Sequence, residues 1–274
     1  MSECYGNYFI HNGIVKPAAL FDNSMVYEGE SVYEVLRMKS GLPYFFEEHI
    51  QRLENSVRLQ KKNMLATMEQ IRDDIIKLAG LEKVKKEVNL KIVFNYSEPS
   101  GNYLLYYIEP VYPTPEQYSN GVKGIFFFAE RINPESKVIN HKLRSEIYHK
   151  LILENAYEAL LVNREGLITE GSRSNIFFIK GNELFTAPDK FVLGGITRKH
   201  ILKICNDFNI NVIHECVKLS EVSNYESVFM TGTSPVVLPF NMIDNISFNV
   251  NHHLIPFLRN IYLEKAEESL EYFV

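Results

Sequence analysis

The sequence predicts an α+β protein with two domains. Short β-branched and aromatic runs between turn residues indicate strands, and segments with apolar residues three or four positions apart indicate amphipathic helices. A stretch with three prolines, residues 110–121, shows neither period and separates two halves. A chain of 274 residues is long enough for two cores. We therefore expect a smaller N-terminal α+β domain over residues 1–112, a linker over 113–121 and a larger C-terminal domain over 122–274.

Two hairpins open the first half. Asn12 and Gly13 both tolerate positive φ, so residues 8–15 favour two short strands joined by a tight turn. Residues 31–46 are rich in β-branched and aromatic side chains and turn at Ser40-Gly41, which predicts the second hairpin. Two helices and then two strands are expected at residues 47–59, 68–78, 90–94 and 103–108.

The second half mixes strands and helices without an internal repeat. Strands are expected at residues 122–129, 158–163, 174–179, 183–186, 211–215 and 227–231. Helices are expected at residues 140–156, at 197–208 and from Leu254 onward, with a short helical turn at 219–222. The pattern is that of a second α+β domain.

Composition excludes several classes of function. The formal net charge is -5, so a surface built mainly for nucleic acid is a poor expectation. The three cysteines and the histidines lack metal-ligand spacing, and no metal site is expected. No stretch has the roughly 20 apolar residues of a membrane helix, and the N-terminus lacks the pattern of a secretory signal. We expect a soluble cytoplasmic protein that binds no membrane.

Three polar segments could carry chemistry. Glu170 lies at a strand end in ITEGSRSN, where a lone carboxylate is usually solvated. Gly194-Gly195 precede Thr197, read as the N-cap of a helix, and a helix start suits an anion such as phosphate. The loop Thr231–Ser234 has similar small hydroxyl side chains. Each segment alone is equally compatible with an ordinary turn.

The helix predicted at residues 47–59 carries an arginine that could bind an anion. His49 and Arg52 are three residues apart and should share a face. Most such pairs are solvated, but a guanidinium suits phosphate oxygens if the fold brings one to it.

Taken in order, these segments resemble the fold type IV pyridoxal phosphate enzymes, a group of branched-chain aminotransferases, D-amino-acid aminotransferases and aminodeoxychorismate lyases. The motifs that carry the resemblance are SVYEVLRM with GLPYFFEEHIQRL, EALLVNREGLITEGSRSNIFFIKGNELFTAP, LGGITR and FMTGTSPVVLP. They span almost the whole chain. The resemblance implies a two-domain fold with the cofactor, pyridoxal 5'-phosphate, at the domain junction.

The resemblance also implies a role for each segment. Arg52, Ile196, Thr197 and Thr233 would bind the cofactor phosphate. Glu170 would pair with the pyridine nitrogen and keep it protonated, which makes the ring an electron sink. On the substrate side, Tyr33 matches an aromatic position of the family, and Arg37 could meet a substrate carboxylate.

A lysine must form the Schiff base with the cofactor and move the substrate proton. Lys137 and Lys142 both lie in SKVINHKLRS. The family pattern Lys-x-Leu-Asn matches Lys137-Val-Ile-Asn, and the spacing from Lys137 to Tyr157 needs no gap, whereas Lys142 would need a gap of five residues. We expect Lys137 to be the catalytic lysine.

The implied activity is transfer of an amino group from an aliphatic or branched-chain amino acid to a 2-keto acid. An aminodeoxychorismate lyase that releases pyruvate is the first alternative. A D-amino-acid aminotransferase is the second, although Asn95-Tyr96-Ser97 stands where those enzymes carry an Arg-x-His pair. Gly29-Glu30-Ser31 departs from the frequent Gly-Asp-Gly and leaves specificity open. A non-catalytic binding protein is the least favoured reading, and family members usually form homodimers.

Overall fold

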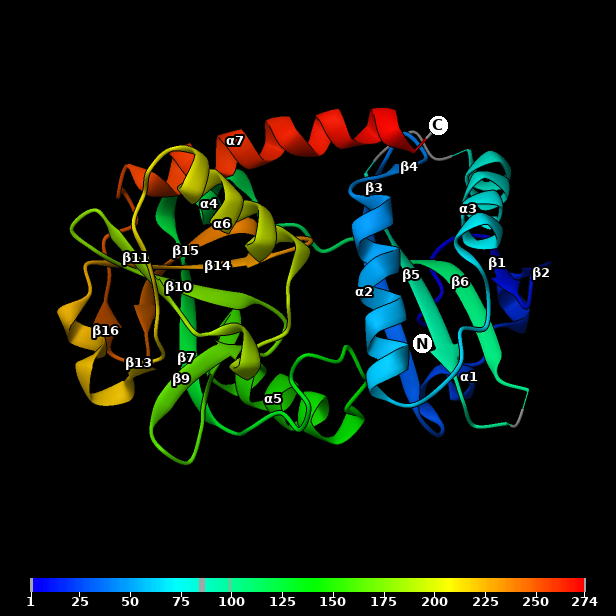
Figure 1. The fold of residues 1–274 in the computed structure, drawn as a ribbon. Coiled ribbons are helices and arrows are strands. Elements are labelled where there is room, and N and C mark those ends of the chain that lie inside the picture. Colours follow the sequence, from blue (N-terminus) through cyan, green and yellow to red (C-terminus); the bar gives the residue numbers. More distant parts are fainter. Residues whose placement is uncertain (1, 84–86, 99, 274) are drawn as a thin grey trace. The chain divides into compact units, whose positions relative to one another are not determined.

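The computed structural model describes residues 2–83, 87–98 and 100–273 of the chain. Its contacts divide these residues into two compact units (Figure 1). The first unit takes the chain up to Val111 together with residues 136–139 and 266–273, and the second takes Tyr112–Glu135 and Asn140–Lys265. Both units combine helices with a sheet, which confirms the predicted α+β class. Among the described residues, every helix is too short or too polar to cross a membrane.

An antiparallel sheet organises the first unit, with its described strands in the order β2-β1-β6-β5-β3-β4. The strands are β1 (Tyr8–His11), β2 (Ile14–Pro17), β3 (Ser31–Lys39), β4 (Leu42–Pro43), β5 (Val88–Asn95) and β6 (Asn102–Ile108). The helices are α1 (Ser24–Tyr27), α2 (Phe46–Leu59) and α3 (Met68–Glu82), with 3-10 turns at Ala18–Leu20 and Leu270–Tyr272. Asn12 and Gly13 both have positive φ, as the predicted tight hairpin requires.

Alternation along β3 sends its side chains to two different cores. Val32 and Leu36 join the apolar residues of α2 and α3 on one face of the sheet. Tyr33 joins Phe9 and Tyr106 on the opposite face. Because successive strand residues point to opposite faces, a charged residue at position 34 must enter the helix-covered core.

Two segments far along the chain complete the first unit. Residues 136–139 pair with the edge of β3 through a bridge between Val32 and Val138. Near the C-terminus, Phe273 is buried in the α2–α3 core and packs edge-on against Phe46 at 4.9 Å between ring centres. The predicted division places both segments in the larger domain, because contacts between residues this far apart in the sequence leave no local pattern.

A ten-stranded mixed sheet organises the second unit, whose residues are all described. Its order is β12-β11-β10-β14-β15-β7-β8-β9-β13, with β16 paired to β15. The strands are β7 (Val122–Phe128), β8 (Glu158–Val162), β9 (Leu167–Gly171), β10 (Asn175–Lys180), β11 (Glu183–Thr186), β12 (Val212–His214), β13 (Val217–Lys218), β14 (Ser227–Gly232), β15 (Val236–Ile243) and β16 (Ile246–Ser247). The helices are α4 (Pro115–Asn120), α5 (His141–Leu153), α6 (Ile196–Asp207) and α7 (Leu254–Ser269), whose last residues belong to the first unit, with 3-10 turns at Asp189–Phe191 and Leu219–Asn224.

The prediction that residues 113–121 form a linker is wrong. Residues 113–121 contain helix α4, and the contacts assign them to the second unit. Pro115 is the first residue of α4, where its missing N–H costs no hydrogen bond. Thr114 and Gln117 form a capping box at the same end. This segment is therefore a folded part of the second unit.

Candidate active site

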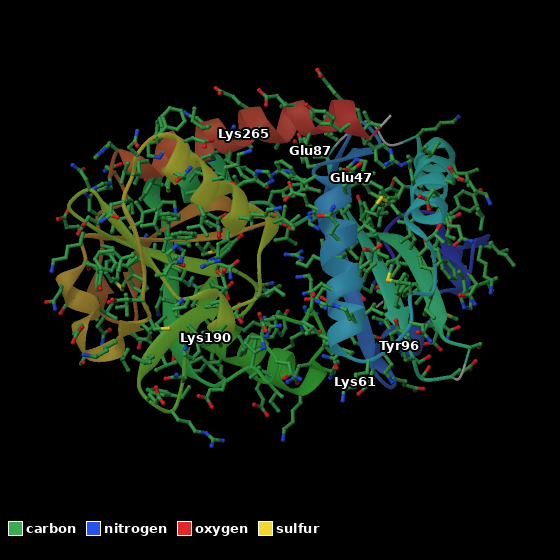
Figure 2. The ribbon with its side chains drawn as sticks, in the orientation of Figure 1. Glu47, Lys61, Glu87, Tyr96, Lys190 and Lys265 are labelled. Carbon is green, nitrogen blue, oxygen red and sulfur yellow. The ribbon has the colours of Figure 1, made fainter. Side chains whose placement is uncertain are left out.

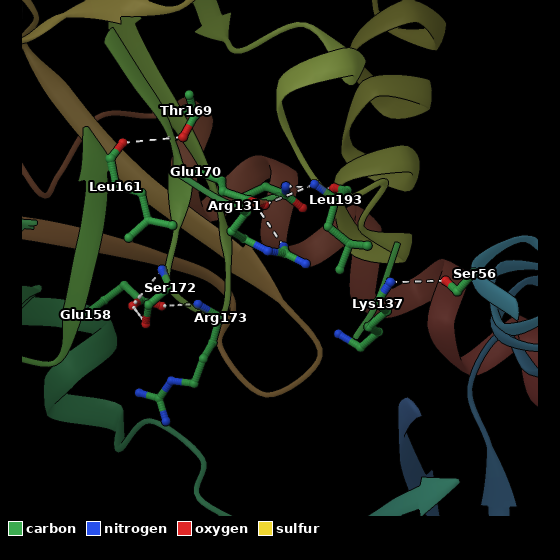
Figure 3. Close-up of polar contacts among 11 residues, drawn as sticks. Ser56, Arg131, Lys137, Glu158, Leu161, Thr169, Glu170, Ser172, Arg173 and Leu193 are labelled. Carbon is green, nitrogen blue, oxygen red and sulfur yellow. Dashed lines mark hydrogen bonds and ion pairs between the residues drawn. The ribbon is translucent and has the colours of Figure 1, made fainter. Parts of the chain in front are cut away.

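Lys137 lies on the segment that pairs with the edge of β3. Its backbone N–H donates to Ser56 Oγ at 3.1 Å (Figure 3), and its carbonyl accepts from Tyr33 N–H at 3.1 Å. The Lys137 ammonium lies 4.7 Å from the centre of the Tyr33 ring, within the range of a cation–π contact. The side chain is half-buried. By contrast, Lys142 is exposed on α5.

A buried carboxylate holds Arg52. Glu34 is fully buried, and its two oxygens accept from Arg52 Nε at 2.8 Å and Arg52 Nη2 at 2.7 Å. His49, one turn earlier on α2, contacts the same carboxylate through Nδ1 at 2.8 Å. His49 and Arg52 thus share the helix face that the i,i+3 spacing predicted. The two-point contact fixes the plane of the Arg52 guanidinium.

The charges of this cluster shift its acid–base equilibria. Burial alone would raise the pKa of Glu34, but the charge and hydrogen bonds of Arg52, with the bond from His49, outweigh it and lower the pKa from 4.5 to about 2. Burial also lowers the pKa of His49, because the interior disfavours the imidazolium, although Glu34 acts in the opposite direction. Glu34 is therefore a carboxylate at neutral pH.

Glu170 is the second buried carboxylate with an arginine. It lies near the end of β9 with 2% of its surface exposed. One oxygen accepts from Arg131 Nη1 at 2.9 Å, and the other accepts from the backbone N–H of Leu193 at 3.0 Å (Figure 3). A lone carboxylate at a strand end is usually solvated, whereas the fold buries Glu170 and holds it in one orientation.

The turn that follows Glu170 is built around a further carboxylate, Glu158. Glu158 is buried at the start of β8 and accepts hydrogen bonds from both the N–H and the hydroxyl of Ser172, the latter at 2.6 Å. The Ser174 hydroxyl donates to its other oxygen at 2.9 Å. A Cβ at Gly171 would lie 2.1 Å from Ser174 Oγ, so a larger residue would displace the Ser174 hydroxyl that donates to Glu158. The small hydroxyl residues of ITEGSRSN thus fix the turn beside Glu170.

Helix α6 presents its N-terminus without a capping side chain. Its N-cap is Gly195, so the prediction of Thr197 as N-cap is wrong, and Thr197 lies in the first helical turn. The first N–H groups of a helix have no intrahelical partner and favour an anion. Thr197 is buried, and its hydroxyl lies 3.2 Å from the Tyr262 hydroxyl. Ile196 begins the helix and is also buried.

The loop that contains Thr233 is a strained connection between β14 and β15. Gly232 pairs with Val236, which leaves three residues in the loop. Val236 has a φ of 56°, a conformation that costs a β-branched residue about 1–3 kcal/mol and that occurs where the surroundings enforce it. Next to the loop, the buried Thr231 hydroxyl has no hydrogen-bond partner among the described residues, which suits a site completed by a ligand.

Arg37 lies apart from Tyr33, the other residue predicted on the substrate side. It lies four residues after Tyr33 on β3, about 13 Å along an extended strand. Its guanidinium forms an ion pair with Glu87, which is labelled in Figure 2. Tyr33 therefore contacts Lys137, whereas Arg37 pairs with Glu87.

Glu34 and Arg131 are among the residues of these clusters that the sequence did not single out. Glu34 occupies an inward position between Val32 and Leu36, and a charged residue at a core position of a strand is a readable signal for a buried partner. Arg131 lies in a loop after β7 with no periodic pattern, so the sequence offers no local signal for its contact with Glu170.

Comparison with known proteins places these features in a family. The family model described as amino-transferase class IV matches residues 31–243. The D-alanine aminotransferase of Bacillus licheniformis is 27% identical over 226 residues, which cover 79% of this chain and 80% of that protein. A probable branched-chain-amino-acid aminotransferase of Thermotoga maritima is also 27% identical, with coverage of 84% and 82%. The aminodeoxychorismate lyase of Bacillus subtilis is 25% identical, with coverage of 83% and 82%.

Solved structures share the fold. The branched-chain aminotransferase of Thermoproteus uzoniensis with norvaline superimposes with a TM-score of 0.85 at 19% identity, covering 97% of this chain and 98% of that one. That of Thermobaculum terrenum in its PLP form gives 0.83 at 20% identity, covering 99% and 97%. At these identities the likeness establishes the fold.

The Glu34 cluster predicts an acid-dependent part of the stability. A carboxylate with a lowered folded-state pKa stabilises the fold above its unfolded-state value and loses this contribution as the pH falls through the folded value. The relevant window runs from about pH 4.5 to about pH 2, and the contribution is on the order of 3 kcal/mol. The free energy of unfolding of Glu34→Gln should therefore fall less steeply below pH 4.5 than that of the wild type, as measured by urea titration at successive pH values.

Glu54→Gln is the matched control, because Glu54 is exposed on the same helix. Its pH profile should follow the wild type. Equal slopes for Glu34→Gln and the wild type below pH 4.5 would contradict the assignment of a lowered pKa to Glu34.

Proposed function

The chain belongs to the class IV aminotransferase family, and we propose that it transfers the amino group of an aliphatic amino acid to a 2-keto acid with pyridoxal 5'-phosphate. The match covers most of the chain and confirms the resemblance that the motifs carried. The chain is thus an enzyme of the aminotransferase class. The finer assignments below are proposals that rest on residues within each unit.

The observation that carries the proposal is the orientation of Glu170. This buried carboxylate is held in one orientation, because Arg131 binds one of its oxygens and Leu193 N–H binds the other. The proposed role of Glu170 is to hold a proton on the pyridine nitrogen of the cofactor. The bound cofactor supplies an electron sink for the negative charge that develops at the substrate Cα. Arg131 acts as a positioning residue for the Glu170 carboxylate.

Lys137 is the proposed Schiff-base lysine. Its backbone is fixed by hydrogen bonds with Ser56 and Tyr33, so the flexible part is the side chain alone. The Lys137 side chain is half-buried, and a lysine amine is the group that forms a Schiff base with a carbonyl compound. The Tyr33 ring lies beside the amine and is proposed to line the substrate side. Lys137 would move the proton between the substrate Cα and the cofactor.

The residues present fit a phosphate. Arg52 offers a guanidinium whose plane Glu34 fixes, and a fixed planar fork suits phosphate oxygens. In the second unit, the first amides of α6 at Ile196 and Thr197 and the loop at Thr233 are donors of the kind that an anion requires. From the family resemblance, we propose Arg52 in the first unit, and Ile196, Thr197 and Thr233 in the second, as contacts of the cofactor phosphate.

The preference for an aliphatic donor rests on the branched-chain aminotransferases among the relatives. Two alternatives have support of the same kind, because a D-alanine aminotransferase and an aminodeoxychorismate lyase are relatives at similar identity. The lyase reaction would release pyruvate without a keto acid acceptor. Arg37, paired with Glu87, stays a proposed contact for a substrate carboxylate.

A homodimer in the cytoplasm completes the proposal. Both features follow from the family resemblance and from the composition, and both stay predictions. Light scattering at working concentration should give twice the mass of one 31.8 kDa chain. A monomer in active preparations would contradict the predicted dimer.

The assignment of Lys137 predicts a spectroscopic result. Purified wild-type protein with pyridoxal phosphate should be yellow, and Lys137→Ala should lose the visible absorption band of the lysine adduct. Lys142→Ala is the matched control, because Lys142 is an exposed lysine five residues away, and its band should persist. Borohydride reduction and peptide mapping should mark Lys137. A mark on Lys142 would overturn the assignment.

The reaction class is tested with a substrate panel. L- and D-amino acids are supplied with 2-oxoglutarate or pyruvate, and keto acid formation is measured. We expect turnover of aliphatic L-amino acids that depends on the acceptor. Pyruvate release from aminodeoxychorismate without an acceptor would support the lyase instead, and turnover confined to D-amino acids would support the second alternative.

A further inference from the structure

Helix α4 reaches the strained loop between β14 and β15 through one tyrosine. The Tyr118 hydroxyl donates a hydrogen bond to the carbonyl oxygen of Pro235 at 3.1 Å. Pro235 is the last loop residue before Val236, the residue with positive φ. All these residues belong to the second unit.

We propose that Tyr118 is a positioning residue that holds the Thr233 loop in the conformation that binds the cofactor phosphate. The proposal rests on the proposed function, because it presumes that the loop at Thr233 binds this phosphate. It adds a residue from a segment that composition alone assigns to a linker. Tyr118 itself touches neither cofactor nor substrate in this scheme and acts through the backbone of the loop.

The loop needs an external support because its own residues do not favour its shape. A β-branched residue such as Val236 avoids positive φ, so the isolated loop would relax toward other backbone conformations. Pro235 has no N–H, and its carbonyl is the backbone group through which the loop can be held at this point. The Tyr118 hydrogen bond meets this carbonyl directly. A Cβ at Gly232 would lie 3.3 Å from the Pro235 ring, so this ring packs closely against the last residue of β14.

Tyr118 is itself held in place by its surroundings. The guanidinium carbon of Arg259, on α7, lies 3.6 Å from the centre of the Tyr118 ring, which fixes the ring plane. The Asn241 side chain, on β15, donates to the carbonyls of Asn120 at 2.9 Å and Gly121 at 3.2 Å at the end of α4. Helix α4 is therefore fastened to the strand that leaves the loop.

Gly121, at the C-terminal end of α4, also packs tightly against β15. This residue has a φ of 70°, and a Cβ there would lie 2.8 Å from the backbone nitrogen of Asn241. The close approach of the two backbones places α4 against β15 with little room for movement. Because α4 is held against β15, the Tyr118 hydroxyl is held beside the Pro235 carbonyl and can fix the position of the loop.

The test separates the phosphate from the rest of the cofactor. Dissociation constants of pyridoxal phosphate and of pyridoxal, which lacks the phosphate, are measured on full-length wild type and on Tyr118→Phe. The variant keeps the ring against Arg259 and removes only the hydroxyl. We expect the dissociation constant for pyridoxal phosphate to rise about fivefold, the usual value of one hydrogen bond, with that for pyridoxal unchanged. Tyr148→Phe, the same change at an exposed tyrosine of α5, should alter neither.

A second variant, Val236→Gly, tests whether the positive φ of Val236 is the reason that the loop needs the Tyr118 hydrogen bond. Glycine adopts positive φ readily, so in Val236→Gly the loop needs less support. The further change Tyr118→Phe should then alter the pyridoxal phosphate affinity by less than about twofold. Equal effects of Tyr118→Phe on both ligands, no effect on either, or an undiminished effect in the Val236→Gly background would overturn the proposal. A wild type that binds no pyridoxal phosphate would instead contradict the proposed function.

Discussion

The pairing of buried carboxylates is the constraint on which the candidate site depends. Removing a carboxylate from water costs several kcal/mol unless donors replace the lost hydration. Glu34, Glu158 and Glu170 are each at most 2% exposed, and each receives hydrogen bonds from a neighbouring element. Because these partners are obligatory, each carboxylate fixes the place of an arginine or a turn.

The same constraint explains why this chain can bind an anion despite its net charge of -5. The acidic excess does not describe the local field at any one group. The guanidinium of Arg52 is held in one plane by a buried glutamate, and α6 offers backbone N–H groups that carry no formal charge. Anion recognition of this kind depends on the orientation of donors more than on the number of basic residues.

Local patterns in the sequence predicted the elements whose stability is local. The Asn12-Gly13 hairpin and helix α2 follow from turn chemistry and from apolar spacing, and both are present. Strand β15 was missed because Pro239 interrupts its pattern and because it pairs with the distant strand β7. The family pattern singles out Lys137 and Glu170 as candidates, but it does not single out Arg131, because the contact of Arg131 with Glu170 arises only when the chain folds.

Helix α4 shows how composition and local chemistry can point in opposite directions. Three prolines in residues 110–121 favour a linker on composition. Yet Thr114-Pro115-Glu116-Gln117 combines a capping box with a proline at the first helical position, and that order predicts a helix start. A proline in the first turn removes no hydrogen bond, so its presence there is not a reason to expect an irregular segment. The position of a proline relative to a cap therefore outweighs the number of prolines. Once the helix forms, Tyr118 is carried on a rigid element and can fix the Pro235 carbonyl, which a flexible linker could not do.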